Sequence, residues 1–234
     1  MKHKTKVILT TIFVIFDIVL LGSIIIIRDA TMRNNLYKEA NLLAKQDFTQ
    51  DRYNTKLKTS GRYGKIENTM KSYLDDYAVT LQGIAKDIHN DSLTQVLSYK
   101  NYETDGPEFK KSITYLSNSK KEFNKKVDKL ISNSKENSII NYGKSKLSNT
   151  RNLDIYKDLM LDDKMMANFE DTQTTLNETK VRMNNIYDTS SSILEFLAKN
   201  KDNWKLENGE IKFKTQALYD EYNNMINKLN NKWS

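Results

Sequence analysis

The chain contains no cysteine and only one proline among its 234 residues. Without cysteine it can form no disulfide, no thiolate metal site and no cysteine nucleophile, so an exported form of the chain must rely on packing for its stability. One proline and seven glycines leave few places where a helix has to end. The composition therefore predicts an all-α chain that is helical almost throughout.

Recognisable catalytic and cofactor motifs are also absent from the sequence. The chain has two histidines, His3 and His89. His89 lies close to Asp87 and Asp91, but residues two apart on a helix point to nearly opposite sides, so this group is not expected to hold a metal. No glycine-rich phosphate loop, HExxH helix or EF-hand spacing is present. We therefore expect no enzymatic activity, no metal and no cofactor.

Positive charge is in modest surplus. The formal net charge is +7, and the three lysines at positions 2, 4 and 6 contribute to it. The remainder, about +4, is too small for a nucleic-acid-binding surface, so we expect no nucleic-acid partner. The basic stretch from Lys120 to Lys129 is interrupted by acids and indicates a solvated helix face. Contact with anionic lipid headgroups or wall polymers is the alternative.

A long apolar run lies near the N-terminus. Residues 7–27, VILTTIFVIFDIVLLGSIIII, would span roughly 31 Å as a helix, which is the thickness of a bilayer's hydrocarbon core. The run is longer than the apolar part of a cleavable signal peptide, and Arg28 follows it where small residues would be needed. The lysines before it favour a cytoplasmic N-terminus. The sequence predicts a cytoplasmic tail at 1–6, a single transmembrane anchor at 7–27 and an extracytoplasmic remainder.

One acidic residue interrupts this anchor. Asp17 lies near its midpoint, where an acid costs roughly 2.5–3.5 kcal/mol. Intramembrane acids usually face protein, and Thr10 lies on the same helical stripe as Asp17. We predict that Asp17 and Thr10 contact a membrane-protein partner or a second copy of the anchor. The alternative is a protonated Asp17 that a strongly apolar helix tolerates.

The rest of the chain has apolar residues at spacings of three and four, which is typical of bundled helices. Residues 28–60 are predicted to form a stalk and first bundle helix, and residues 61–234 the bundle itself. Short loops at 60–64, 101–107 and 132–136 would fold about four long helices back antiparallel. A weaker helical region at 139–161 is predicted to be interrupted near Gly143 and Ser148-Asn149. The predicted buried positions include Leu36, Ala40, Leu43, Met70, Leu74, Tyr77, Leu116, Phe123, Val127, Met166, Phe169, Leu176 and Met183.

A β-hairpin is predicted within residues 203–213. Asn208-Gly209 is a strong signal for a two-residue turn, because both central residues of that turn need positive φ. The turn would pair Leu206 with Ile211 and Trp204 with Phe213 on one face. A lone hairpin is only marginally stable, so that face must pack on the bundle, which we predict, or serve as a docking surface for a partner.

These features predict a single-pass membrane protein with an extracytoplasmic helical bundle. The excess of Lys and Asn indicates A/T-rich codons and hence a low-GC bacterium. We expect a non-catalytic interaction or scaffold module of an envelope complex, with the lipid bilayer and a membrane protein as partners. One alternative is a ligand-sensing ectodomain that signals through a partner subunit, since the bundle resembles chemoreceptor-type ligand-binding domains in outline. The other is a structural coiled coil of the envelope, either spanin-like or division-type.

Overall fold

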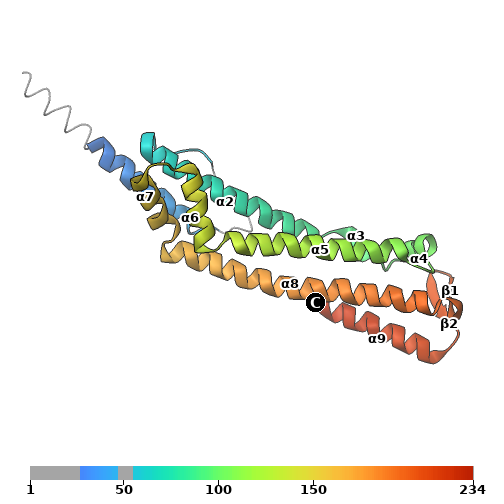
Figure 1. Cartoon of the computed structure of the whole chain (residues 1–234). Coiled ribbons are helices and arrows are strands. Elements are labelled where there is room, and N and C mark those ends of the chain that lie inside the picture. Colours follow the sequence, from blue (N-terminus) through green and yellow to red (C-terminus); the bar gives the residue numbers. More distant parts are fainter. Residues whose placement is uncertain (1–26, 47–54, 234) are drawn as a thin grey trace, which may run out of the picture. The chain divides into compact units, whose positions relative to one another are not determined.

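The computed structural model describes residues 27–46 and 55–233, and these residues are mostly helical. They fall into two units, whose helices and strands are labelled in Figure 1. Unit 1 holds the described residues up to Asp76 together with residues 136–168, and unit 2 holds residues 77–135 and those from Phe169 onward. Two helices, α2 (Gly61–Ile88) and α8 (Asp163–Lys199), contribute residues to both units.

Unit 1 combines a helix at residues 27–43 with the first part of α2, α6 (Glu136–Lys146), α7 (Thr150–Met160) and the start of α8. Leu36, Ala40 and Leu43 are buried, as their spacing predicts. They form the core with residues of the other helices, including Ile66, Met70, Leu74, Ile139, Tyr156, Met160 and Met165.

Close packing joins α6 to α7. A Cβ added at Gly143 would lie 2.4 Å from Cε1 of Tyr156, so only glycine lets the buried tyrosine ring approach α6 this closely. The Tyr156 hydroxyl donates a hydrogen bond to the carbonyl of Ile139 at 3.3 Å. The predicted interruption is therefore confirmed at Ser148-Asn149 and is wrong at Gly143. The break lies at residues 147–149, where the side chain of Asn149 caps α7 by accepting a hydrogen bond from the amide of Asn152.

Unit 2 contains the end of α2, α3 (Asp91–Gln95), α4 (Tyr99–Asp105), α5 (Lys110–Asn133), most of α8, the hairpin and α9 (Gln216–Trp233). Lys120 pairs with Asp188 at 2.6 Å, and Asp128, two turns farther along α5, pairs with Lys180. Because the partner on α8 moves backward as α5 moves forward, these two helices are antiparallel (Figure 1). The predicted positions on α5 and α8 that are buried include Leu116, Phe123, Val127, Phe169, Leu176 and Met183.

Several predicted boundaries are wrong. The predicted loop at 60–64 is mostly the first turn of α2, and most of the predicted loop at 101–107 belongs to α4. Residues 28–60 are predicted to hold a stalk and first bundle helix, and the described helix there ends at residue 43. Met165 is fully buried in place of Met166, because the register at the start of α8 differs by one residue from the predicted seam.

The predicted hairpin is confirmed. Strand β1 (Trp204–Glu207) pairs antiparallel with β2 (Glu210–Phe213), with Trp204 opposite Phe213 and Leu206 opposite Ile211. Asn208 and Gly209 have φ of 52° and 82°, the left-handed values that the two-residue turn requires.

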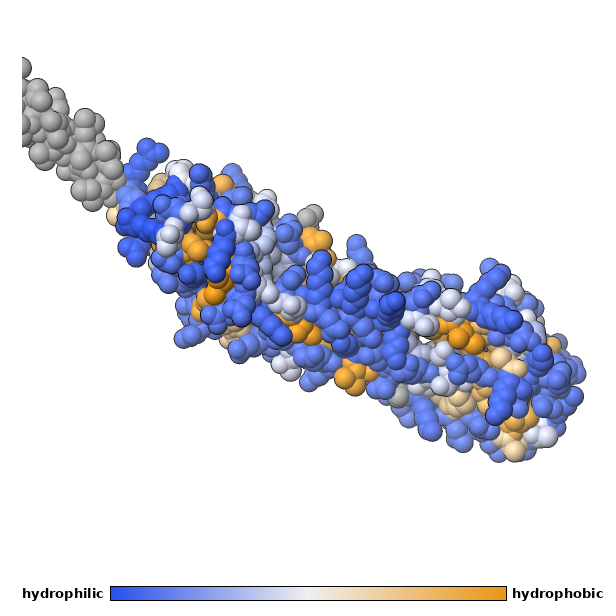
Figure 2. Space-filling view, viewed as in Figure 1, coloured by the Kyte–Doolittle hydropathy of each residue, from blue (hydrophilic) through white to orange (hydrophobic). Residues whose placement is uncertain are grey.

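Within the described residues, no helix combines the length and the apolar character needed to cross a membrane. On the face drawn in Figure 2, hydrophobic residues form small patches among hydrophilic ones. The predicted tail at 1–6, the predicted anchor up to residue 26, and with them Thr10 and Asp17, lie outside the described residues. The anchor and its intramembrane contact therefore stay predictions.

Candidate functional site

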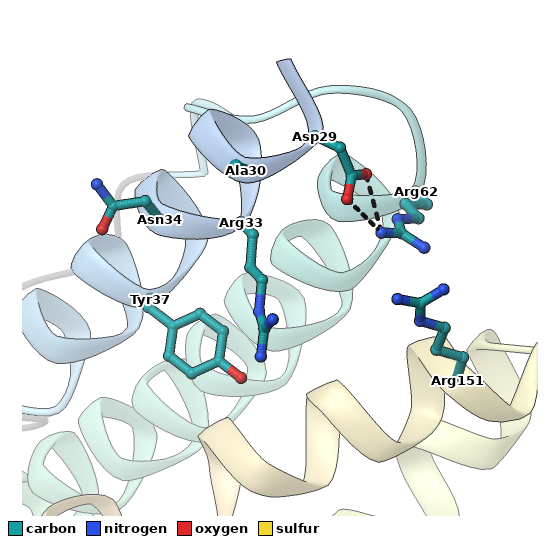
Figure 3. Close-up of a pocket in the computed structure, with 7 residues that line it drawn as sticks. All are labelled: Asp29, Ala30, Arg33, Asn34, Tyr37, Arg62 and Arg151. Carbon is teal, nitrogen blue, oxygen red and sulfur yellow. Dashed lines mark hydrogen bonds and ion pairs between the residues drawn. The ribbon is translucent and has the colours of Figure 1, made fainter. Parts of the chain in front are cut away.

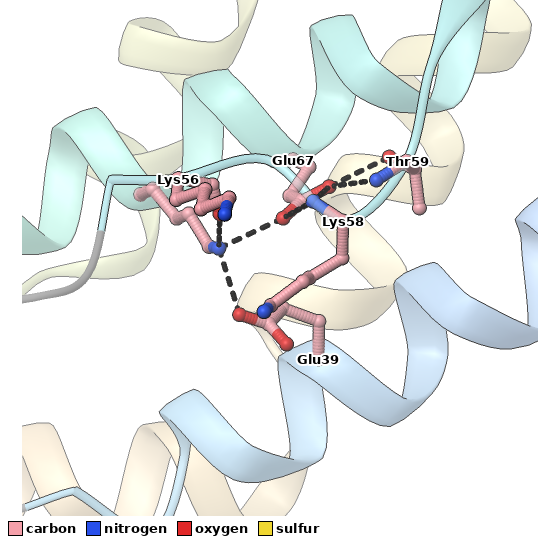
Figure 4. A network of polar contacts seen from close by, with 6 residues as sticks. Glu39, Lys56, Lys58, Thr59 and Glu67 are labelled. Atoms are coloured by element: carbon pink, nitrogen blue, oxygen red, sulfur yellow. Dashed lines mark hydrogen bonds and ion pairs between the residues drawn. The ribbon is translucent and has the colours of Figure 1, made fainter.

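Unit 1 buries a network of charged side chains between α2 and the helix at 27–43 (Figure 4). The exposed fraction is 0% for the Glu67 side chain and 1% for that of Lys71, one turn later on α2. The Lys71 ammonium lies 2.8 Å from Oε1 of Glu67 and 2.7 Å from Oε1 of Glu39. It also donates a hydrogen bond to the carbonyl of Lys56 at 2.7 Å. One cation thus joins both helices and the loop before α2.

Both carboxylate oxygens of Glu67 have hydrogen-bond partners. It accepts hydrogen bonds from the backbone amides of Lys58 and Thr59 and from the Thr59 hydroxyl, at distances of 2.7–3.0 Å. Burial alone would raise the pKa of Glu67, but the hydrogen bonds from Lys71, from Thr59 and from the two amides lower it below its ordinary value. Glu67 is therefore held ionised. Because its charged groups are paired with one another, a network of this kind fixes the positions of the helices and does not offer a reactive side chain.

A groove lined by arginines opens on the same unit (Figure 3). It has a volume of about 700 Å³ and is bounded by the helix at 27–43, the start of α2 and the start of α7. We call it the arginine groove. Its lining residues are Asp29, Ala30, Arg33, Asn34, Tyr37, Arg62 and Arg151. Three cations face one carboxylate there, so the groove carries a surplus of positive charge.

Arg62 is held in place at one side of the arginine groove. Its Nη2 atom lies 2.8 Å from both carboxylate oxygens of Asp29 and donates a hydrogen bond to the hydroxyl of Tyr63. The Nε atom of Arg62 is buried and has no hydrogen-bond partner. The guanidinium of Arg33 lies over the ring of Tyr37, 5.5 Å from its centroid. Figure 3 shows Arg151 extending from α7 toward Arg62.

The predicted hairpin residues take part in two kinds of contact. The Trp204 indole donates to the carbonyl of Leu197 at 2.7 Å and stacks on Phe109 with 6.0 Å between ring centroids. Phe213 lies 5.3 Å from Tyr222 and 6.2 Å from Phe196, measured between ring centroids.

Leu206 and Ile211, the other two residues of that hairpin face, line a groove of about 730 Å³ in unit 2. Tyr99 and Tyr219 line the same groove, with exposed fractions of 38% and 47%. Phe213 lines this groove as well, so the hairpin packs Trp204 and Phe213 on neighbouring helices while Leu206, Ile211 and Phe213 also border an open groove.

The remaining sequence candidates form no site in the part of the chain that the structure describes. His89 is exposed, and Asp87 pairs with Lys126 at 2.7 Å. No group of three or more His, Asp or Glu side chains among the described residues could hold a metal ion.

Sequence reasoning missed both features of unit 1. Glu67 and Lys71, four residues apart, have the spacing of an ordinary solvent-exposed pair on a helix surface. The arginine groove draws on three separate stretches of the chain, and no local pattern connects them.

Residues 161–234 of the chain are similar to a family described as "Protein of unknown function (DUF3053)". The matched residues contain α8, the hairpin and α9. Neither the curated proteins nor the solved structures contain a match to the chain.

Proposed function

We propose that this chain is a membrane-anchored interaction or scaffold module of a bacterial envelope complex. Residues 7–27 would form a single transmembrane helix with the N-terminus inside. A bundle of about four long antiparallel helices would lie outside the cell membrane. In this proposal the protein acts by binding and catalyses no reaction.

The observation that carries the proposal is the buried ion contact between Glu39 and Lys71. Glu39 lies about 18 Å beyond the predicted end of the anchor if the helix is continuous, at 1.5 Å per residue. Buried ion pairs of this kind constrain geometry even where their net contribution to stability is small. The contact fixes the helix at 27–43 to α2, so a membrane anchor continuous with this helix would hold unit 1 in a fixed orientation.

The two grooves support a binding role. The arginine groove offers charge and hydrogen-bond donors, and the groove beside the hairpin offers tyrosine hydroxyls and aliphatic surface. Their lining residues do not include a nucleophile held by a base, the arrangement that covalent catalysis needs.

A ligand-sensing ectodomain is the second candidate. The arginine groove favours it, since a small anion bound there would contact residues of the helix at 27–43, which directly follows the predicted anchor. The antiparallel pairing of α5 and α8 speaks against the third possibility, a continuous envelope rod.

Cysteine labelling tests the proposed topology. The chain has no native cysteine, so Ser117→Cys, at an exposed position of α5, introduces a single reactive thiol. We expect a membrane-impermeant maleimide to label this variant in intact cells. Thr5→Cys, in the predicted tail, is the matched control and should be labelled only after lysis. Labelling of Ser117→Cys only after lysis, or recovery of the protein in the alkali-washed soluble fraction, contradicts the proposal.

A further inference from the structure

The arginine groove has cationic groups that the protein's own side chains do not neutralise. Arg151 is exposed and has no hydrogen-bond or ion-pair partner among the described residues. The Nε atom of Arg62 is buried and likewise has no hydrogen-bond partner. Figure 3 shows these two guanidinium groups facing each other. Because like charges repel, an anion between them would relieve the repulsion and satisfy unused donors.

The residues that line the groove also lie at a defined depth. Asp29 and Arg33 follow the predicted end of the anchor by about 3 Å and about 9 Å along the helix axis. The polar layer of a bilayer extends about 5–8 Å beyond the hydrocarbon core on each side. Asp29 holds Arg62 at this level through its two contacts of 2.8 Å. The groove would therefore begin within the layer that holds the lipid phosphate groups, with Arg33 just beyond its outer limit.

From these observations we propose that the arginine groove binds the phosphate group of an anionic phospholipid headgroup. The inference rests on the proposed function, because the anchor is what brings the groove to the lipid surface. Arginine suits this ligand, since its planar fork of N–H donors matches two phosphate oxygens at once. Arg151 supplies free donors, Arg33 adds a second cation beside Tyr37, and the Asp29 contact keeps Arg62 oriented. An inorganic phosphate ion would offer the same chemistry without the lipid.

The test uses the full-length chain in a non-ionic detergent. Native mass spectrometry measures binding of three probes, which are phosphatidylglycerol, zwitterionic phosphatidylcholine and inorganic phosphate. We expect phosphatidylglycerol to bind most tightly. The double variant Arg33→Gln/Arg151→Gln should weaken that binding by roughly tenfold or more, given that each basic residue at a lipid surface contributes on the order of one kcal/mol. Arg33→Lys/Arg151→Lys should retain part of the binding, because the charge remains while the two-point contact is lost.

Arg182→Gln is the matched control, since Arg182 is exposed on α8 and does not line the groove. We expect it to bind phosphatidylglycerol like the unmodified chain. An equal loss in this control would mean that binding follows total charge, and would overturn the inference. Equal binding of phosphatidylcholine would overturn it too. Tighter binding of inorganic phosphate than of phosphatidylglycerol would assign the groove to the free ion and overturn the lipid assignment.

The two proposals can fail separately. The detergent assay needs no particular topology, so loss of specific lipid binding together with correct Ser117→Cys labelling would refute only the groove inference. Specific lipid binding with labelling on the wrong side would refute only the topology. A thermal melt of each variant checks that the helices remain folded. Arg33 and Arg151 are both exposed, so we expect these melts to be unchanged.

Discussion

The ammonium group of Lys71 and the carboxylate of Glu39 lie 2.7 Å apart and join α2 to the helix at 27–43. Lys71 also pairs with Glu67, so one cation contacts two carboxylates, of which Glu67 is fully buried and Glu39 is 12% exposed. The site as a whole holds one negative charge more than it holds positive charges. Removal of the cation should therefore lower the free energy of unfolding more than removal of either acid does.

Lys71→Met tests the role of this cation. The substitution leaves two buried carboxylates without their shared partner, and we expect it to lower the free energy of unfolding by roughly 3–5 kcal/mol. Circular dichroism of the full chain in detergent during a urea titration measures the change. Lys65→Met, at an exposed position of the same helix, is the control and should change stability by less than about 0.5 kcal/mol. Similar losses in both variants would contradict a special role for Lys71.

The pKa of Glu67 predicts how stability changes with pH. This pKa is lower in the folded chain than in the unfolded one, so folding favours the ionised form of the carboxylate. The resulting stabilisation is present above the unfolded pKa of about 4.3 and is lost as the pH falls through the lower, folded value. Melting temperatures between pH 7 and pH 3 should therefore fall less steeply for Glu67→Gln than for the unmodified chain. Equal slopes would show that Glu67 does not contribute to the acid sensitivity.

Two glycines give opposite predictions for the same substitution. Gly143→Ala would bring a methyl group against the ring of Tyr156, and overpacking of this kind costs typically 1–3 kcal/mol. At Gly83, within α2, an added Cβ has nothing within 4 Å, so alanine should stabilise the chain by roughly 0.5–1 kcal/mol. Urea titrations of both variants measure these changes in the free energy of unfolding. A stabilised Gly143→Ala variant would contradict the close approach of α6 and α7.

Truncating Trp204 tests whether the apolar face of the hairpin stabilises the fold. Trp204→Ala removes both the stack on Phe109 and the hydrogen bond to Leu197, and we expect a loss near the low end of the 3–5 kcal/mol typical of such truncations, because the indole is only half buried. Lys205→Ala, on the opposite face of β1, is the control and should have little effect. A melting temperature unchanged by Trp204→Ala would instead favour a docking role for this face.

Asp17 is tested in the membrane. If it contacts a partner there, Asp17→Leu should still insert, more favourably by roughly 3 kcal/mol, yet lose the partner in crosslinking and purification from native membranes. Asp17→Asn keeps hydrogen bonding without charge and should retain part of the association. Unchanged partner recovery with the leucine variant would make Asp17 a tolerated acid without a contact.

Local signals predicted the hairpin well. Its register follows from the Asn208-Gly209 turn and the alternation beside it, which involve only neighbouring residues. The buried face of the first helix, including Leu36 and Leu43, was equally clear from helical spacing. Gly143 was misjudged because its role depends on Tyr156, which belongs to another helix. Spacing alone cannot distinguish a glycine that ends a helix from one that admits a neighbour.

The polar features of unit 1 depend on contacts distant in sequence. Glu67 and Lys71 are buried because Glu39 and the loop at 55–60 cover them, and nothing in the local sequence indicates that cover. The arginine groove likewise needs Arg62 and Arg151, which come from different helices. A single sequence shows such residues as ordinary surface charges, so their convergence could be found only in the folded chain.

Unit 1 is built from two stretches of chain, residues 27–76 and 136–168, that are separated by residues of unit 2. Tyr73 packs against Tyr142, and the side-chain amide of Asn168 donates to the carbonyl of Gln46 at 3.0 Å, so the first stretch is incomplete without the second. A ribosome adds about 5–20 residues per second, and the intervening segment therefore takes several seconds to make. During that interval the apolar face of the nascent first helix has no finished core to enter. We therefore expect apolar surface of the first stretch to stay exposed during this interval, the condition under which nascent chains aggregate.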